Sequence, residues 1–260
     1  MLKRLSSQSV SLWLLVIVFA ASLSVWYISR ERVFYFWDYA FYMDMAVHVS
    51  KMFIHNPFQA INTIYLSTSL DYNYYFAVPL IPFLEVFRYS RLGYILGLVF
   101  VYHVPAMIAC GYVVRRIFPF APYAGWITIL AGLSVPALWA SVFRGFPDTG
   151  AVFLITLAII FYLQDMELKQ WRVQLPMIGV ISALAVIFRR HFAYSVISFW
   201  FSIGIFLMFY SIKNSGKDKR RFILESLNIL VKILIVLLFF FLSIILLAPG
   251  LLLKFSIQTI

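Results

Sequence analysis

The sequence is poor in charged residues and in cysteine. Of its 260 residues, 12% are charged and 63% are hydrophobic, whereas a soluble domain has about 25% charged and about 45–50% apolar residues. The apolar residues form long blocks without charge. Such blocks exclude a soluble domain and predict membrane-spanning α-helices, because the strands of a membrane barrel alternate between apolar and polar residues.

Several signatures of soluble enzymes are missing. The single cysteine, Cys110, excludes an intrachain disulfide and a cysteine-based metal site. The sequence has no glycine-rich phosphate loop, no dinucleotide-binding pattern and no HExxH motif, so a soluble nucleotide enzyme is not indicated. The net charge of +11 comes from basic residues at the ends of apolar blocks, as the positive-inside rule requires. It therefore does not indicate a nucleic-acid partner.

The charge-free blocks predict an all-α polytopic membrane protein. We expect about seven spans in a single domain, residues 1–260, with no separate soluble C-terminal domain. The predicted spans are 5–29, 92–114, 123–143, 151–163, 173–188, 192–212 and 223–247. Lys232 falls in the seventh predicted span, and we expect it within the first turns of that helix.

Basic residues set the predicted orientation. The start at Lys3-Arg4 and the basic loop 213–221 are expected on the cytoplasmic side, which places the N-terminus in the cytoplasm. The first block is longer than the apolar core of a signal peptide, about 7–15 residues. We therefore expect an uncleaved helix, with cleavage near Ala20-Ala21-Ser22 as the alternative.

A long outer loop is predicted between the first two spans. Residues 30–91 contain several tyrosines and only short apolar pieces, and four acidic residues follow Glu31 in this range. We expect interfacial helices at about 38–54 and 78–87. The first of them is expected to end at Asn56-Pro57, because proline disfavours helix in the residue before it.

The first predicted interfacial helix begins with an acid. Asp38, Tyr42 and Ala46 are spaced i, i+4 and i+8, so they share one helix face. An acid this close to a membrane span is costly unless it is solvated or used. The alternative is a structural role, because aspartate is a favoured N-cap.

A second set of charges lies beside two short apolar stretches. Residues 149–164 and 173–188 are 16 residues each, below the usual limit of about 17 for a span. Asp148 and Arg189 are therefore expected at, or slightly below, the outer interface. Arginine can snorkel there, but a basic group on the side that the positive-inside rule disfavours indicates function.

These residues suggest chemistry on a lipid phosphate. Asp38 and Asp148 are suited to activating a nucleophile or holding a divalent cation. Guanidinium groups match the oxygens of a phosphate. The basic residues predicted on the outer face are Arg144, Arg189, Arg190 and His191.

Asp38, Tyr42 and Ala46, just after the first span, resemble the start of the GT-C type membrane glycosyltransferases, which include protein O-mannosyltransferases and the lipid A aminoarabinose transferase. Members often have a second acid in a later outer loop, matched here by Asp148 in Arg144-Gly145-Phe146-Pro147-Asp148. Many members have two consecutive acids at the first position, where this chain has Tyr39 second. Members also commonly have more spans, which favours a truncated enzyme as an alternative.

The resemblance implies a multi-pass protein of the cell inner (plasma) membrane that transfers a sugar outside the cytoplasm. The donor would be a polyprenyl-phosphate sugar, and the acceptor a glycan, lipid or protein. Asp38 would be the base or orient the acceptor, and Asp148 would assist it or bind a divalent cation. Tyr42 and His191 would contact substrate, and the arginines would neutralise the lipid phosphate. The alternatives are a transporter or flippase of lipid-linked sugars and a non-catalytic assembly subunit.

Overall fold

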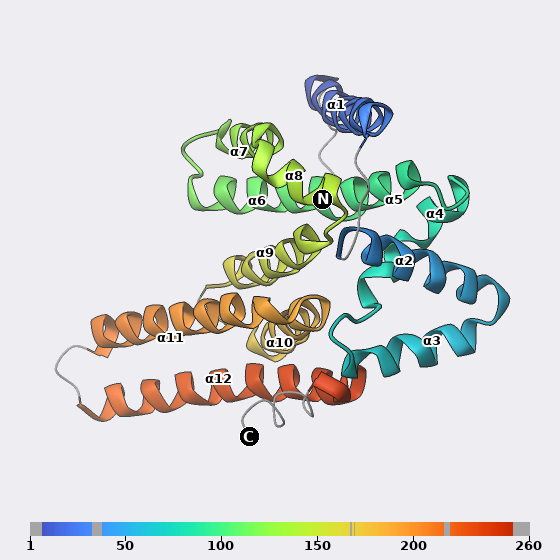
Figure 1. Ribbon diagram of the computed structural model, residues 1–260. Helices are drawn as coiled ribbons and strands as arrows, with labels where there is room; N and C mark the ends of the chain where they lie inside the picture. The colour runs from blue at the N-terminus through green and yellow to red at the C-terminus, as the bar shows by residue number, and fades with distance from the viewer. Residues whose placement is uncertain (1–6, 33–37, 167, 169, 216–218, 252–260) are drawn as a thin grey trace. The chain divides into compact units, whose positions relative to one another are not determined.

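The regular secondary structure of the protein is helical. The computed structural model describes residues 7–32, 38–166, 168, 170–215 and 219–251, and no β-strand occurs among them (Figure 1). This confirms the predicted all-α class. The basic start at Lys3-Arg4 and residues 216–218 of the basic loop lie outside the described residues.

The chain divides into two compact units, each built from two stretches of sequence. Unit 1 comprises Met1–Ala60 and Phe76–Gly150, and unit 2 comprises Ile61–Tyr75 and Ala151–Ile260. The predicted outer loop 30–91 is therefore shared, because its middle part belongs to unit 2.

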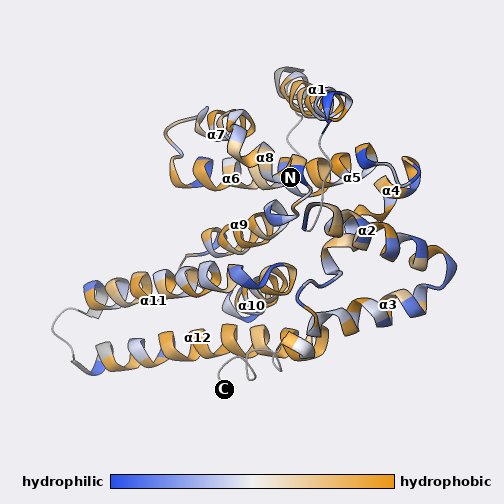
Figure 2. Ribbon diagram, viewed as in Figure 1, coloured by the Kyte–Doolittle hydropathy of each residue, from blue (hydrophilic) through white to orange (hydrophobic). Residues whose placement is uncertain are grey.

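Apolar helices of membrane-spanning length make up much of the chain. Among the described residues, five helices are long and apolar enough to cross a membrane: Ser11–Arg30, Arg91–Ile117, Trp171–Phe188, Arg190–Lys213 and Ile223–Leu247. A bent pair, α7 (Ala124–Ser134) and α8 (Pro136–Arg144), would add a sixth span if it crosses as one. Figure 2 shows apolar residues along most of the length of the long helices. The protein is thus an all-α polytopic membrane protein.

Two of the predicted spans take a different form. The predicted span 123–143 is broken into α7 and α8, which are bent by 55°. Val135 is extended, with ψ 110°, because the ring of Pro136 disfavours the helical conformation in the preceding residue. The predicted span 151–163 corresponds to α9 (Asp148–Gln164), whose 17 residues reach only the lower limit for crossing.

Unit 1 is built around one long helix. It comprises α5 (Arg91–Gly97), a π-helical stretch at Leu98–His103 and α6 (Val104–Ile117), and it is largely buried. Pro105 lies two residues after the end of the π-helical stretch. Proline has no N–H to donate to the preceding turn, so the i→i−4 ladder is interrupted there, and a π-bulge is one way for a helix to continue through such a point.

α6 and α7 approach each other at two glycines. A Cβ atom on Gly111 would lie 2.6 Å from the carbonyl oxygen of Gly125, and one on Gly125 would lie 2.8 Å from the carbonyl oxygen of Gly111. No side chain fits at either position without moving backbone. The two prolines of the connecting turn, Pro119 and Pro122, restrict the chain where it reverses direction.

Aromatic contacts attach α1 (Ser7–Arg30) to the rest of unit 1. Trp13 lies against Trp126 of α7, with ring centroids 4.7 Å apart, and Tyr27 stacks on Phe143 of α8 at 4.2 Å. Most other side chains of α1 are exposed, as expected for a helix that faces lipid over much of its surface.

The two helices predicted in the outer loop are present in unit 1. They are α2 (Asp38–His55) and α4 (Ile81–Val86), the latter preceded by a 3₁₀ helix at Tyr75–Leu80. The Ser50 hydroxyl of α2 donates a hydrogen bond to the Glu85 carboxylate of α4 (2.6 Å), which ties the two helices together.

Unit 2 contains three long helices, α10 (Trp171–Phe188), α11 (Ala193–Ser215) and α12 (Lys219–Leu247). The closest approach again occurs at a glycine, because a Cβ atom on Gly179 would lie 2.6 Å from the carbonyl oxygen of Val236. α10 and α12 therefore pack backbone to backbone at this point.

The position of Lys232 corrects one prediction. α12 begins at Lys219 and ends at Leu247, so Lys232 lies more than three turns into the helix and close to its middle. The predicted span 223–247 agrees with the candidate span Ile223–Leu247, while the helix itself continues upstream into the basic loop.

A helix that the sequence did not predict leads into unit 2. After α3 (Pro57–Leu66), the chain runs along the ends of α10 and α12. The Asn73 side-chain amide donates to the carbonyl oxygen of Ile187 (2.5 Å), and the Tyr75 hydroxyl donates to that of Leu247. These two bonds explain why the middle of the outer loop belongs to unit 2.

We predict that Gly111→Ala destabilises the protein by about 1–3 kcal/mol, because the added methyl group would push against the backbone of α7. The measurement is the thermal unfolding midpoint of the purified protein in detergent. Gly204→Ala in α11 is the matched control. A Cβ atom there would meet only the Ile233 Cδ1 atom, at an ordinary 3.6 Å. An unchanged midpoint for Gly111→Ala would mean that the close approach does not support the fold.

Candidate functional site

α2 presents its predicted face to the interior of unit 1. Asp38 is the first residue of the helix. One and two turns later, Tyr42 and Ala46 are buried, with 2% and 0% of their surfaces exposed. Asp44 is exposed. The 3.6-residue helical period therefore predicted correctly that Asp44 lies off the face that carries Tyr42 and Ala46.

Tyr42 connects this face to the second predicted acidic segment. Its ring packs edge-on against Phe146, with centroids 5.7 Å apart, and against Phe76 at 5.2 Å. Phe146 lies two residues before Asp148, and Tyr42 lies four residues after Asp38. The two acidic segments, far apart in sequence, are therefore side by side in unit 1.

The turn that carries Phe146 is held by hydrogen bonds from the central helix. α8 ends at Arg144, and the next residue, Gly145, has a φ of 98°, the left-handed conformation that glycine adopts easily after a helix. The Tyr94 hydroxyl donates to the carbonyl oxygen of Gly145 (2.7 Å), and the Arg91 guanidinium donates to that of Phe143 (2.7 Å). The carbonyls at the end of α8 are thus satisfied by side chains of the central helix, the buried Tyr94 and the half-buried Arg91.

Arg91 also forms the principal ion pair of this region. Its guanidinium donates two hydrogen bonds to the Glu31 carboxylate, at 3.1 and 3.2 Å. With the bond to Phe143, this arginine is committed to structure. Arg144 has an exposed side chain and lies on the same turn as Asp148.

Asp148 begins α9 and is half-buried. Burial raises the pKa of its carboxyl group to about 6, because the charged form loses hydration. A carboxyl group with this pKa can exchange a proton close to neutral pH, which suits a general acid or base. Perturbed groups of this kind are concentrated at functional sites.

The basic group predicted at the outer face belongs to unit 2. Arg189 is extended between α10 and the 3₁₀ turn Arg190–Phe192. The ring of His191, an exposed residue, lies 4.7 Å from that of Phe192. Asp38, Tyr42, Arg144 and Asp148 are residues of unit 1, so the predicted site residues divide between the two units.

Arg190 has a structural role in unit 2. Its guanidinium donates to the backbone carbonyls of Leu70 (3.4 Å) and Asp71, and it lies 3.6 Å from the Asp71 carboxylate. It therefore holds the segment that follows α3. Of the two adjacent arginines, Arg190 therefore serves as an anchor, and phosphate binding by Arg189 stays a prediction.

A metal site is not defined by the protein alone. Within the part of the chain that the structure describes, no group of three or more His, Cys, Asp or Glu residues could hold a metal ion. Magnesium is often bound by one or two carboxylates together with substrate phosphates. A divalent cation at Asp38 and Asp148 stays a prediction.

Sequence reasoning missed the residues that hold the site together. Phe146, Tyr94 and Arg91 act on partners far away along the chain, and Tyr94 and Arg91 bond to carbonyls 51 and 52 positions away. No local spacing reveals such pairs. The available signal for their role was that Arg91 and Tyr94 place polar groups at the start of an apolar block.

Comparison with known proteins adds no relative. No protein-family model, curated protein or solved structure matches the chain. Function is therefore inferred from the residues and their arrangement.

We predict that Asp148→Asn stabilises the protein at pH 7 by about 1–3 kcal/mol. In the folded protein the pKa of the Asp148 carboxyl group is about 6, above its ordinary value. The stability that the protonated carboxyl group contributes is therefore fully present below about pH 4. It is lost as the pH rises through about 6. The measurement is the unfolding midpoint in detergent from pH 4 to pH 8. The difference between variant and wild type should vanish near pH 4, and Asp44→Asn should show no such pattern. A variant no more stable than wild type at pH 7 would contradict the pKa assignment.

We predict that Arg190→Ala releases residues 67–75 from unit 2, because the bonds to Leu70 and Asp71 are lost. Amide hydrogen exchange in that segment should become at least tenfold faster, consistent with about 1.5–3 kcal/mol for a hydrogen bond from a charged group. Arg190→Lys should restore only part of the protection, because lysine lacks the forked donors. Arg144→Ala is the control and should leave this segment unchanged. Unchanged exchange in Arg190→Ala would show that Asn73 and Tyr75 hold the segment without it.

Proposed function

We propose that the protein is a membrane glycosyltransferase that moves a sugar from a polyprenyl-phosphate donor to an acceptor on the extracytoplasmic side. The observation that carries the proposal is the contact between Tyr42 and Phe146. It brings together the segments of Asp38 and Asp148, which are the two acids that the GT-C resemblance selects. Two carboxyl groups from separate segments are a common arrangement for acid–base chemistry at a sugar.

In this proposal, an acceptor hydroxyl attacks C1 of the donor sugar. The new bond forms between the acceptor oxygen and C1, while the bond from C1 to the phosphate oxygen breaks with inversion. The hydroxyl proton passes to a carboxylate, and the polyprenyl phosphate leaves with the electron pair. Asp38 is the proposed base, with a contribution of about 10²–10⁴-fold typical of such groups. Asp148 assists it or helps to bind a divalent cation.

The leaving phosphate requires positive charge. Arg144 is exposed on the same turn as Asp148, which makes it the first candidate in unit 1. Arg189 and His191, which the resemblance also selects, belong to unit 2 and stay predictions from the sequence. Arg190 is a weaker candidate than the sequence indicated, because its guanidinium already binds Leu70 and Asp71.

A transporter of lipid-linked sugars is the second candidate function, and Lys232 favours it. Transporters bind their substrates near the bilayer midplane, where charged residues are otherwise rare. Lys232 lies near the middle of α12. Transport predicts movement of the intact sugar lipid between leaflets, whereas transfer predicts release of free polyprenyl phosphate.

We predict that Asp38→Asn lowers sugar transfer at least a hundredfold in proteoliposomes that contain a polyprenyl-phosphate sugar and an acceptor. Asparagine keeps the size of the side chain but removes its basicity. The measurement is release of polyprenyl phosphate, normalised to the amount of inserted protein. Asp44→Asn is the matched control, because Asp44 lies on the same helix but is exposed. Equal activity in wild type and Asp38→Asn would support the helix-cap role of Asp38. Movement of intact donor without phosphate release would favour transport.

A further inference from the structure

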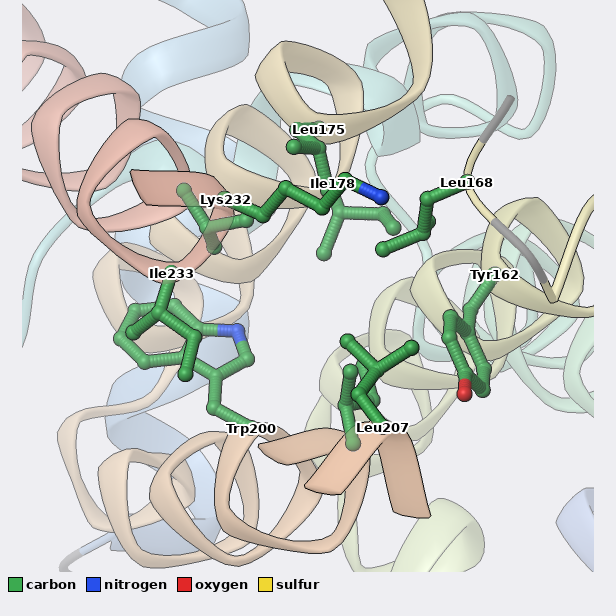
Figure 3. A pocket seen from close by; sticks show the side chains of 10 residues that line it. Tyr162, Leu168, Leu175, Ile178, Trp200, Leu207, Lys232 and Ile233 are labelled. Atoms are coloured by element: carbon green, nitrogen blue, oxygen red, sulfur yellow. The ribbon is translucent and has the colours of Figure 1, made fainter. Parts of the chain in front are cut away.

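Unit 2 contains a small apolar chamber with a lysine in its wall (Figure 3). The chamber lies between α10, α11 and α12, and its volume is about 30 Å³. Leu175 and Ile178, Trp200 and Leu207 supply apolar walls, and Lys232 supplies the charge. Since one water needs about 10–15 Å³ of such volume, the chamber has room for a group of two or three heavy atoms.

The charge of Lys232 is not neutralised by a direct contact within the described chain. No described residue forms a hydrogen bond or an ion pair with its amine. Asp165 is the acid whose charge reaches it, without an ion pair to the amine, and its carboxylate accepts a hydrogen bond from the Gln170 backbone N–H (2.8 Å). Lys232 is the tenth of the 25 residues in the candidate span Ile223–Leu247, and a lysine inside a membrane span is expensive and by default indicates a function.

The residue beside the amine has an uncommon backbone conformation. In Figure 3 the amine points toward Leu168, which lines the chamber and is 1% exposed. Its φ of 55° is left-handed, which costs a bulky residue about 1–2 kcal/mol. Backbone strain of this kind is often found at ligand sites.

The chamber adjoins a larger groove between α11 and α12. Trp200 and Ile233 line both spaces. The groove has a volume of about 800 Å³, and its lining is apolar apart from Ser226. On α12 its lining residues run from Ser226 to Ile244, about 27 Å in all, and the part from Ile233 to Ile244, which leads away from the chamber, is about 17 Å long. This is close to one leaflet, about 15 Å, which is the reach of one acyl chain.

We propose that unit 2 binds a single-chain amphiphile with a carboxylate head, of the fatty-acid class. The head lies in the chamber beside the Lys232 amine, and the chain lies in the groove between α11 and α12. A carboxylate fits the small chamber and neutralises the lysine charge, and the apolar groove supplies the surface that the chain needs. This site is separate from the acidic site of unit 1 and does not depend on the proposed transferase activity.

The test is palmitate binding to the purified full chain in nanodiscs, measured by calorimetry. Lys232→Met should weaken binding at least tenfold, because a charged hydrogen bond is lost, whereas Lys232→Arg should retain most of it. Lys213→Met is the matched control, since Lys213 is exposed at the end of α11, and it should bind as wild type does. Gly204→Phe fills the groove without changing charge and should also weaken binding at least tenfold.

Ligand variants separate the head from the chain. Hexadecanol has no charge, so it should bind wild type at least tenfold more weakly than palmitate does. For the same reason, its affinities for wild type and for Lys232→Met should be equal. Dodecyl phosphate should bind more weakly than laurate, because its head is larger than the chamber, and the opposite order would assign the site to a phosphate lipid instead. Equal palmitate binding by Lys232→Met and Lys213→Met would overturn the proposal. Wild-type affinity in Gly204→Phe would overturn the placement of the chain.

Discussion

Close approach of backbones at glycine is the constraint on which both units depend. In a lipid environment helices gain little by hiding apolar side chains from one another, so association relies on van der Waals contact and hydrogen bonds. Gly111 and Gly125 let α6 and α7 touch in unit 1, and Gly179 lets α10 meet α12 in unit 2. Elsewhere, α1 and α11 keep much of their surface exposed, because a membrane covers apolar side chains without a protein partner.

Polar side chains are used mainly to satisfy backbone carbonyls where helices end. Arg91 and Tyr94 bond to the end of α8, while Asn73 and Tyr75 bond to the ends of α10 and α12. Each bond fixes a turn that would otherwise expose carbonyls in a poorly hydrated place. The turn before Asp148 is thereby rigid, and a rigid turn is what a functional carboxyl group needs if it is to meet a substrate at a constant distance.

Other charged residues suggest where chemistry takes place. In unit 1, Asp38 and Asp148 belong to segments joined by the contact of Tyr42 with Phe146, and this supports a transferase. In unit 2, Lys232 stands in an apolar chamber next to a lipid-sized groove. The two sites would serve different ligands, one a phosphate-linked sugar and the other a fatty carboxylate.

The sequence by itself determined what depends on local pattern. Its charge-free blocks gave the helical membrane class, the 3.6-residue period put Tyr42 and Ala46 on a buried face with Asp44 outside it, and the short stretch after Asp148 became the 17-residue α9. Pro136 was a local signal for the break between α7 and α8, but the length of the apolar block favoured one continuous span. Only the tertiary structure decided that Arg190 binds the segment after α3, that Lys232 faces a chamber, and that Phe146 joins the acidic segments. The contacts of Asn73, Arg190 and Tyr75 join residues 114, 119 and 172 positions apart, and no periodicity within one helix encodes which distant segment it will meet.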